Sequence, residues 1–485
     1  MKTAQTTLLV FVSKVVSSAT GFVATIYFAR LLGAEILGIY ASIIALISWI
    51  VYIGRAGILN GMKKRLSEGN EQGSFLTAGT VMMFILVSVL SILLWISRTA
   101  VESYFTSFQQ YSELPLLVFL ILLFVSYMLF TLVTQILEGQ DIVHIAGLLR
   151  PVNLGLRSLL QIGFVFFGFG LVGMLSGYIG GLLIAALIGL VFISIVPALP
   201  EKQHFVSLFD YAKFSWLGGL QSRAFNNLDI LILGVFVSQM LVGIYSVAWS
   251  LTMFMNLFSS SIGQAMFPKI SNASAQGSVG TVVRFVEDSI AYSGYITIPG
   301  FIGGLLLADR LLIIYGESFV QGSRILRVLL LSILIYGYMQ SIMSALNAID
   351  RPESAFYVNA VFIFTNAVAN ILLIQAIGWL GAAVASLLAS VVGLLCSYYI
   401  LTRSISVSIP VTEISRQIVA AIVMGGVVWS GREIIETINL LQHNILVVIL
   451  LVTYGALVYN GVLAVLSKEF RNIIQRNIQF EKPNS

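Results

Sequence analysis

The sequence predicts an all-α integral membrane protein with about fourteen transmembrane helices. Hydrophobic residues make up 58% of the 485 residues and charged residues only 10%, and the mean hydropathy is +0.97. A soluble domain averages about 45–50% apolar and about 25% charged residues. Apolar stretches also recur along the chain, each near the roughly 20 residues that a helix needs to cross a hydrocarbon core. A β-barrel would show shorter, alternating segments, so we expect helical spans.

Each predicted span is an apolar run bounded by polar or charged residues. The first run begins near Thr7 and has neither a short apolar region nor an A-x-A-type cleavage site, so we expect a retained span rather than a signal peptide. In chain order the predicted spans are 7–29, 39–59, 75–97, 115–137, 151–170, 172–197, 211–236, 241–262, 284–307, 323–347, 354–377, 380–402, 415–431 and 444–466.

The basic residues in the predicted loops are distributed unequally between the two membrane faces. If the N-terminus is cytoplasmic, eighteen lysines and arginines fall on the cytoplasmic side, Arg157 among them, and six fall on the outer side. Short cytoplasmic loops carry the excess of positive charge in membrane proteins. We therefore expect a multi-pass protein of the cell membrane with both termini in the cytoplasm, and the net charge of +5 does not indicate binding to nucleic acid.

An internal repeat is visible at an offset of 205 residues. The stretch Ala29–Leu46 aligns without a gap on Gly234–Leu251, and Gly38-Ile39-Tyr40 falls on Gly243-Ile244-Tyr245. This offset corresponds to six spans, an even number, so the repeat is parallel, as in transporters built from two related halves. The predicted domains are an N-terminal six-helix lobe (1–200), a cytoplasmic linker (201–213), a C-terminal six-helix lobe (214–403), and two additional helices with a basic cytoplasmic tail (404–485).

Four segments carry a resemblance to a known family. They are FARLLGAEILGIY (Phe28–Tyr40), LDILILGVFVSQMLVGIYSVA (Leu228–Ala248), FPKIS (Phe267–Ser271) and IGWLGAAVASLLAS (Ile377–Ser390). In order and spacing they resemble the oligosaccharide and polysaccharide flippases of the multidrug/oligosaccharidyl-lipid/polysaccharide (MOP) exporter superfamily. The resemblance implies two six-helix lobes around a central cavity that move a lipid-linked glycan to the outer leaflet by alternating access. It also implies, as partners, the lipid bilayer, the lipid-linked oligosaccharide and a glycan polymerase or glycosyltransferases.

Two cations inside predicted spans are the leading candidates for substrate contact. A charge at the centre of a membrane helix costs roughly 2.5–3.5 kcal/mol on insertion scales, so it needs a reason. Lys14 lies on a polar stripe with Ser18, and Arg223 lies on another with Asn226 and Asn227. Arginine binds a phosphate through two parallel hydrogen bonds and lysine binds it as a point charge, which suits a lipid pyrophosphate. The alternative is that Lys14 reaches the membrane surface and that Arg223 pairs within the protein.

Three further charged residues complete the candidate set. Arg30 and Arg55 end the first two spans, where they either line the mouths of a cavity or reach the interface. Asp229 lies deeper in its span and is a candidate ion-coupling residue, although a pairing role near the outer surface is the commoner explanation.

The sequence contains no enzyme signature and implies no cofactor. It has no Walker A motif, no H-E-x-x-H motif and no histidine pair at metal spacing, so we expect neither catalysis nor a metal site. The one cysteine, Cys396, excludes a disulfide within the chain. A monomer suffices for a two-lobed transporter, and the sequence leaves the oligomeric state open.

Three other functions compete with the flippase interpretation. A cation-coupled multidrug antiporter of the same superfamily would require an acidic site in the N-terminal lobe, whose predicted spans have no carboxylate at mid-depth. A membrane glycan polymerase or ligase would carry catalytic arginine or histidine in a long outer loop. The longest predicted outer loop, 98–114, has one arginine and no histidine. A purely structural scaffold would not explain why cations lie inside predicted spans, where a charge is costly.

Overall fold

The computed structural model describes the backbone of residues 3–55, 57–215, 220–438 and 443–472, and the side chains of residues 20–55, 57–213, 228–437 and 443–472. The described residues form helices and connecting segments without strands. The chain divides into two compact units, Met1–Gly243 and Ile244–Ser485. The all-α membrane fold predicted from the sequence is confirmed.

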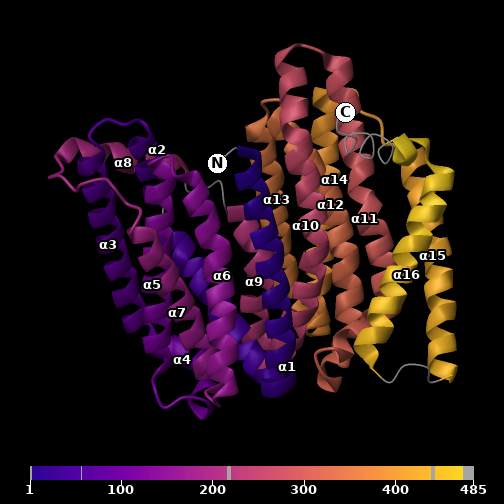
Figure 1. Ribbon diagram of the computed structural model, residues 1–485, viewed down its shortest axis with the longest axis horizontal. Coiled ribbons are helices and arrows are strands. Elements are labelled where there is room, and N and C mark those ends of the chain that lie inside the picture. The colour runs from indigo at the N-terminus through magenta and orange to yellow at the C-terminus, as the bar shows by residue number, and fades with distance from the viewer. Residues whose placement is uncertain (1–2, 56, 216–219, 439–442, 473–485) are drawn as a thin grey trace. The chain divides into compact units, whose positions relative to one another are not determined.

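The first unit contains α1 (Thr3–Arg55) to α9 and the first turn of α10 (Figure 1). In chain order its other α-helices are α2 (Ile58–Ser67), α3 (Gln72–Ile96), α4 (Arg98–Tyr104), α5 (Leu116–Gly139), α6 (Val143–Phe166), α7 (Gly170–Leu190), α8 (Lys202–Ser215) and α9 (Leu220–Phe236), with a short 3-10 helix η1 (Phe108–Gln110) after α4.

The second unit contains the rest of α10 (Gln239–Ala275) and all later helices. They are α11 (Val279–Ile313), α12 (Ser323–Ala348), α13 (Pro352–Ile377), α14 (Leu380–Ser404), α15 (Val411–Ile438) and α16 (Asn444–Leu466), with the 3-10 helix η3 (Glu317–Gly322) before α12.

Eleven helices among the described residues are long and apolar enough to cross a membrane. The predicted spans 7–29 and 39–59 lie in the single helix α1, which bends at Gly33. Helices α6 and α9 correspond to predicted spans but are outside the eleven, since the described α9 has 17 residues and polar residues such as Asn153, Arg157 and Gln161 lower the hydropathy of α6. The count of fourteen therefore stays a prediction.

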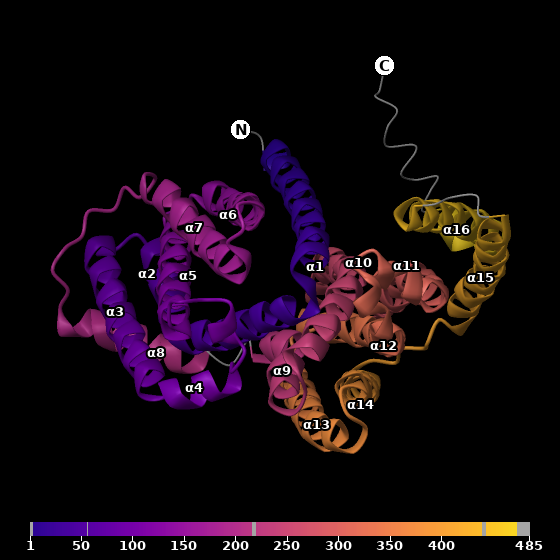
Figure 2. The same cartoon turned by 90° about the horizontal axis from the view of Figure 1, so that it is seen from below.

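The bend in α1 depends on a glycine. Gly33 has φ 81° and ψ 177°, a conformation that is costly for residues with a Cβ atom. The two segments of α1 diverge from this bend (Figure 2). The bend thus allows one helix to supply two predicted spans.

Helix α5 lies at the centre of the first unit, with Leu120, Leu123 and Phe124 fully buried. Helix α3 instead exposes Phe84 and Ile85, as expected of a helix that faces lipid. The polar segment predicted as a linker forms the helix α8, which packs on α2 and α3. Figures 1 and 2 together show α8 lying across the end of the first unit where α1 begins.

Candidate functional site

Helix α6 places a polar face inside the first unit. Asn153, Arg157 and Gln161 are four residues apart, so they lie on one side of the helix. Arg157 follows the start of α6 by fourteen residues, which is roughly 21 Å along the helix axis. Arg157 therefore lies past the middle of a long helix, whereas the sequence-based assignment counted it with the basic residues of the cytoplasmic side.

Two glycines of α7 bring its backbone close to this face. A Cβ atom on Gly181 would lie 2.8 Å from the Cα of Arg157, and one on Gly177 would lie 2.6 Å from the backbone nitrogen of Gln161. Small residues allow two membrane helices to approach this closely. The close packing of α7 holds Arg157 and Gln161 in fixed positions.

The guanidinium group of Arg157 lies over an aromatic ring. Its central carbon is 4.5 Å from the ring centre of Tyr178 on α7, within the range of a cation–π interaction. Tyr40 of α1 and Tyr127 of α5 are also close enough to interact with its charge. The buried Nε atom has no hydrogen-bond partner, and no ion pair joins Arg157 to a carboxylate within the described part of the chain.

Gln161 lies one turn after Arg157 on the same face of α6, and its side chain bonds two neighbouring helices. Its side-chain nitrogen donates to the hydroxyl oxygen of Tyr40 at 2.9 Å and to the carbonyl oxygen of Met174 at 2.7 Å. Gln161 thereby links α6 to both α1 and α7. A buried amide that makes both of these bonds stabilises one arrangement of the three helices.

A second arginine reaches the same side of α5. Arg55, at the end of α1, donates from Nη2 to the hydroxyl of Thr131 at 3.3 Å, and Thr131 donates to the carbonyl of Tyr127 at 2.8 Å. Tyr127 is also a neighbour of the Arg157 charge. Two cations of the first unit, Arg55 and Arg157, therefore meet the same polar stretch of α5.

The other predicted site residues have different positions. Arg30 is exposed and lies three residues before the bend of α1, whereas Arg55 lies at the end of the segment that follows the bend. Asp229 of α9 is buried, with 3% of its surface exposed. The side chains of Lys14, Ser18, Arg223, Asn226 and Asn227 lie outside the described residues, although their backbones belong to α1 and α9.

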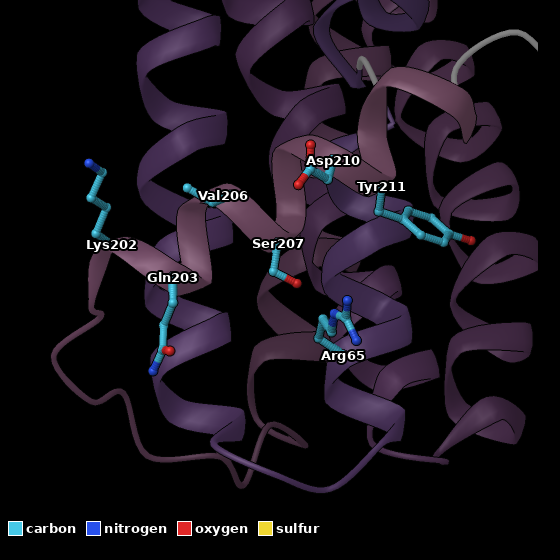
Figure 3. A pocket seen from close by; sticks show the side chains of 7 residues that line it. All are labelled: Arg65, Lys202, Gln203, Val206, Ser207, Asp210 and Tyr211. Carbon is cyan, nitrogen blue, oxygen red and sulfur yellow. The ribbon is translucent and has the colours of Figure 1, made fainter.

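Helices α2 and α8 lie at one end of the first unit. Basic residues at this end form ion pairs with a nearby carboxylate. Lys63 of α2 and Arg150 of α6 both bind Glu138, at 3.1 and 2.8 Å. An open depression of about 740 Å³ lies beside them, between Arg65 of α2 and the exposed face of α8. Figure 3 shows Arg65 and Ser207 pointing toward one another and Lys202 pointing away. This depression is separate from Arg157.

In the second unit, polar side chains mainly form hydrogen bonds between helices of that unit. Ser344 donates to the carbonyl of Gly263 at 3.0 Å, and Ser332 and Ser390 lie 3.2 Å apart. Asn366 is fully buried on α13, and its side-chain amide has no hydrogen-bond partner among the described residues. Within the same described ranges, no group of three or more histidine, cysteine or acidic residues could hold a metal ion.

Arg157 is the residue that sequence reasoning missed. It lies inside the predicted span 151–170, so its position within an apolar run could have marked it as an intramembrane cation. Its neighbours could not be predicted, because Tyr40, Tyr127 and Tyr178 come from three other helices.

Comparison with known proteins gives consistent matches. Residues 27–324 match the family model described as polysaccharide biosynthesis protein. The chain is 30% identical over 485 residues to the probable flippase AglR of Haloferax volcanii, covering 98% of each chain. It is 24% identical to the probable low-salt glycan biosynthesis flippase Agl15 of the same organism, covering 95% of this chain and 96% of the relative.

A solved structure has a similar overall fold. The fold is similar to that of the lipid II flippase MurJ in an inward closed conformation, with a TM-score of 0.78 and 16% identity over 96% of this chain and 100% of that chain. The fold of this flippase agrees with the fold that the four sequence segments predicted. The chain is a multi-pass membrane protein, and it belongs to the polysaccharide biosynthesis protein family.

Proposed function

We propose that this protein is a flippase that moves a polyprenyl-(pyro)phosphate-linked oligosaccharide from the cytoplasmic to the outer leaflet of the cell membrane by alternating access. The observation that carries the proposal is Arg157, an intramembrane cation with no described carboxylate partner. A cation held in an apolar region is stabilised when an anion binds to it. The phosphate groups of a lipid-linked glycan supply such an anion.

The proposed binding site consists of Arg157 and Arg55, together with Lys14, Ser18, Arg223, Asn226 and Asn227. Arg55 adds a second phosphate ligand on the same face of α5, and Arg30 lines the mouth of the path near the bend of α1. Tyr40, which is only partly buried, offers an aromatic face to sugar rings. The names of the relatives AglR and Agl15 support a glycan-linked substrate.

The proposed topology places both termini in the cytoplasm. Without Arg157, the predicted cytoplasmic side still holds seventeen of the eighteen lysines and arginines counted there, against six on the outer side. The ends of the first unit agree with this orientation, because the basic helices α2 and α8 lie where α1 begins. We further propose that the protein transports rather than catalyses, and that it supplies glycan to polymerases or glycosyltransferases on the outer face.

The proposal is tested by flipping in reconstituted vesicles. A fluorescent lipid-linked oligosaccharide is introduced into liposomes that contain the protein, and its exposure to an external lectin is followed over time. Wild type is expected to accelerate exposure over empty liposomes, and Arg157→Gln is expected to reduce the rate about 10- to 100-fold, the value of a charge-assisted hydrogen bond. Arg150→Gln, which changes a cation on the same helix that pairs with Glu138, is the control.

Two outcomes would contradict the proposal. Exposure at the rate of empty liposomes for several lipid-linked glycans would exclude these substrates. Equal losses in Arg157→Gln and Arg150→Gln would show that Arg157 has no special role. Lys14→Ala and Arg223→Ala in the same assay test the other two cations.

Coupling of transport to an ion gradient is a second candidate feature, and buried Asp229 is the observation that favours it. A carboxylate with 3% exposure can bind a coupling proton or Na⁺. If Asp229 couples transport to an ion gradient, Asp229→Asn will abolish the stimulation of transport by that gradient. Stimulation that is unchanged in Asp229→Asn would exclude this role.

A further inference from the structure

A buried polar cluster lies inside the second unit, where α15 and α16 pack against α11. Glu413 and Gln417 lie one turn apart on α15, with 5% and 0% of their surfaces exposed. Tyr459 of α16 is 4% exposed, and Tyr338 comes from α12. Figures 1 and 2 both show α15 and α16 beside α11. Three helices thus contribute polar side chains to one buried region.

Two oxygen atoms of the cluster face the same point beside α11. A Cβ atom on Gly294 would lie 2.5 Å from the hydroxyl oxygen of Tyr338 and closer still to the side-chain oxygen of Gln417. Gly294 is itself buried. Because this position has no side chain, the two oxygens have room to come together there.

The oxygens of the cluster have unused hydrogen-bonding capacity. The side-chain nitrogen of Gln417 donates to the carbonyl oxygen of Ala291 at 3.0 Å, which fixes the amide and leaves its oxygen as an acceptor. This oxygen and the hydroxyls of Tyr338 and Tyr459 are buried without a hydrogen-bond partner among the described residues. Buried polar atoms without a partner cost free energy. A ligand that contacts all three oxygens would therefore stabilise the unit.

Glu413 supplies negative charge beside these oxygens. Its Oε1 accepts from the hydroxyl of Tyr295 at 3.1 Å, and its Oε2 pairs with Arg416 at 3.2 Å. The side chain of Arg416 is 38% exposed, so solvent screens this ion pair. A carboxylate has about four lone-pair sites, and the two contacts leave capacity for more. Tyr459 is close enough to interact with the charge of Glu413 and with Tyr338.

The atoms of the cluster select the kind of ligand. Hydroxyl, amide and carboxylate oxygens bind hard cations, whereas softer metals prefer nitrogen and sulfur. An anion would be repelled by Glu413. A buried charge needs a balancing charge nearby, and one buried carboxylate balances one positive charge. The cluster therefore fits a monovalent cation.

We propose that Gln417, Tyr338 and Tyr459 bind Na⁺, with Glu413 as the balancing charge. The bound ion joins α12 to α15 and α16 through their side-chain oxygens. This site does not depend on the proposed function. It is also separate from Asp229, which belongs to the first unit.

The first test measures binding directly. The purified full-length chain is titrated with radioactive Na⁺ at constant ionic strength, both as wild type and with Asp229→Asn, which removes the other candidate ion-binding residue. One Na⁺ per chain is expected to remain bound in Asp229→Asn. In this background Tyr338→Phe and Tyr459→Phe each remove one oxygen and keep the ring, so each should weaken binding about 5- to 10-fold. Tyr454→Phe, at an exposed tyrosine of α16, is the control.

The second test measures stabilisation by the ion. Sodium chloride at about a hundred times the dissociation constant is expected to raise the unfolding midpoint by about 5 °C over the same concentration of choline chloride. The variant that combines Tyr338→Phe with Tyr459→Phe should lose this gain. Tyr454→Phe should keep it.

The results separate a cation from water and from a site elsewhere. Saturable binding that both site variants weaken and Tyr454→Phe does not would support the proposal. No saturable binding, with equal midpoints in the two salts, would overturn it and show that water alone fills the cluster. Binding that both site variants leave unchanged would also overturn it, because the ion would then lie elsewhere. Neither measurement requires glycan movement, so failure of the proposed function is detected separately.

Discussion

Arg157 shows how a single residue can indicate the chemistry of a transport path. Placing its charge at the centre of a membrane helix costs roughly 2.5–3.5 kcal/mol on insertion scales. The stack on Tyr178 recovers about 0.5–2 kcal/mol, and no described carboxylate forms an ion pair with it. Under the proposed function, the phosphate groups of the substrate offset the remaining cost at Arg157, whereas Arg150 already pairs with Glu138.

At the residue scale, Arg157→Lys separates charge from shape. Lysine keeps the positive charge but loses the planar fork and the extended stack on Tyr178. We expect a flipping rate between those of wild type and Arg157→Gln, together with a lower apparent affinity for the lipid-linked glycan. The measurement is the dependence of the flipping rate on substrate concentration. A rate equal to that of Arg157→Gln would show that the guanidinium geometry, not charge, is required.

At the scale of elements, the α6–α7 pair depends on a glycine face. Gly177 and Gly181 lie four residues apart and face the backbone of α6. The neighbouring Gly180 faces only the flexible end of Leu160, where a Cβ atom would lie 3.0 Å away. The same helix therefore offers a sensitive glycine and a tolerant one.

Gly181→Ala is expected to lower the free energy of unfolding by about 1–3 kcal/mol, because the added methyl group overpacks the contact with Arg157. Gly180→Ala is expected to be neutral or stabilising by up to about 1 kcal/mol, since alanine favours the helix. Denaturant unfolding in detergent micelles measures both variants. Equal stability of the two would show that α6 and α7 can separate freely.

At the scale of the whole molecule, the last two helices are attached to the second unit by a charged network. Arg432 of α15 makes two hydrogen bonds to Asp309 of α11, at 2.7 and 3.0 Å, and a third to Glu436 at 2.8 Å. Arg310 also binds Glu436 and exchanges hydrogen bonds with Asn444 of α16. Two of the six cations predicted on the outer side are therefore used to hold α15 and α16.

Arg432→Gln is expected to loosen this attachment by about 1–3 kcal/mol, because Asp309 and Glu436 lose charge-assisted hydrogen bonds. Limited proteolysis in the segment between α14 and α15 should then proceed faster than in wild type. Arg324→Gln, at an exposed arginine of α12, is the control. Cleavage at the wild-type rate in Arg432→Gln would mean that apolar contacts alone hold the two helices.

The sequence by itself determined the class of the protein, the presence of many membrane-spanning helices and its family. These properties follow from local composition, since a helix in lipid must satisfy its own backbone and present apolar side chains over about 20 residues. The four quoted segments carried the family, which the match over residues 27–324 confirms. Predicted spans such as 323–347 and 444–466 agree closely with α12 and α16.

Tertiary structure alone decided which polar groups meet. Arg157 and Arg55 reach one stretch of α5 from two different helices, and Arg432 meets Asp309 across 123 residues of sequence. Gly38 and Gly243 looked like repeat markers in the sequence, and the structure places their backbones in contact. Such pairings depend on helix rotation and crossing, which are set by many weak packing contacts spread over the whole bundle and not by the residues of any one segment.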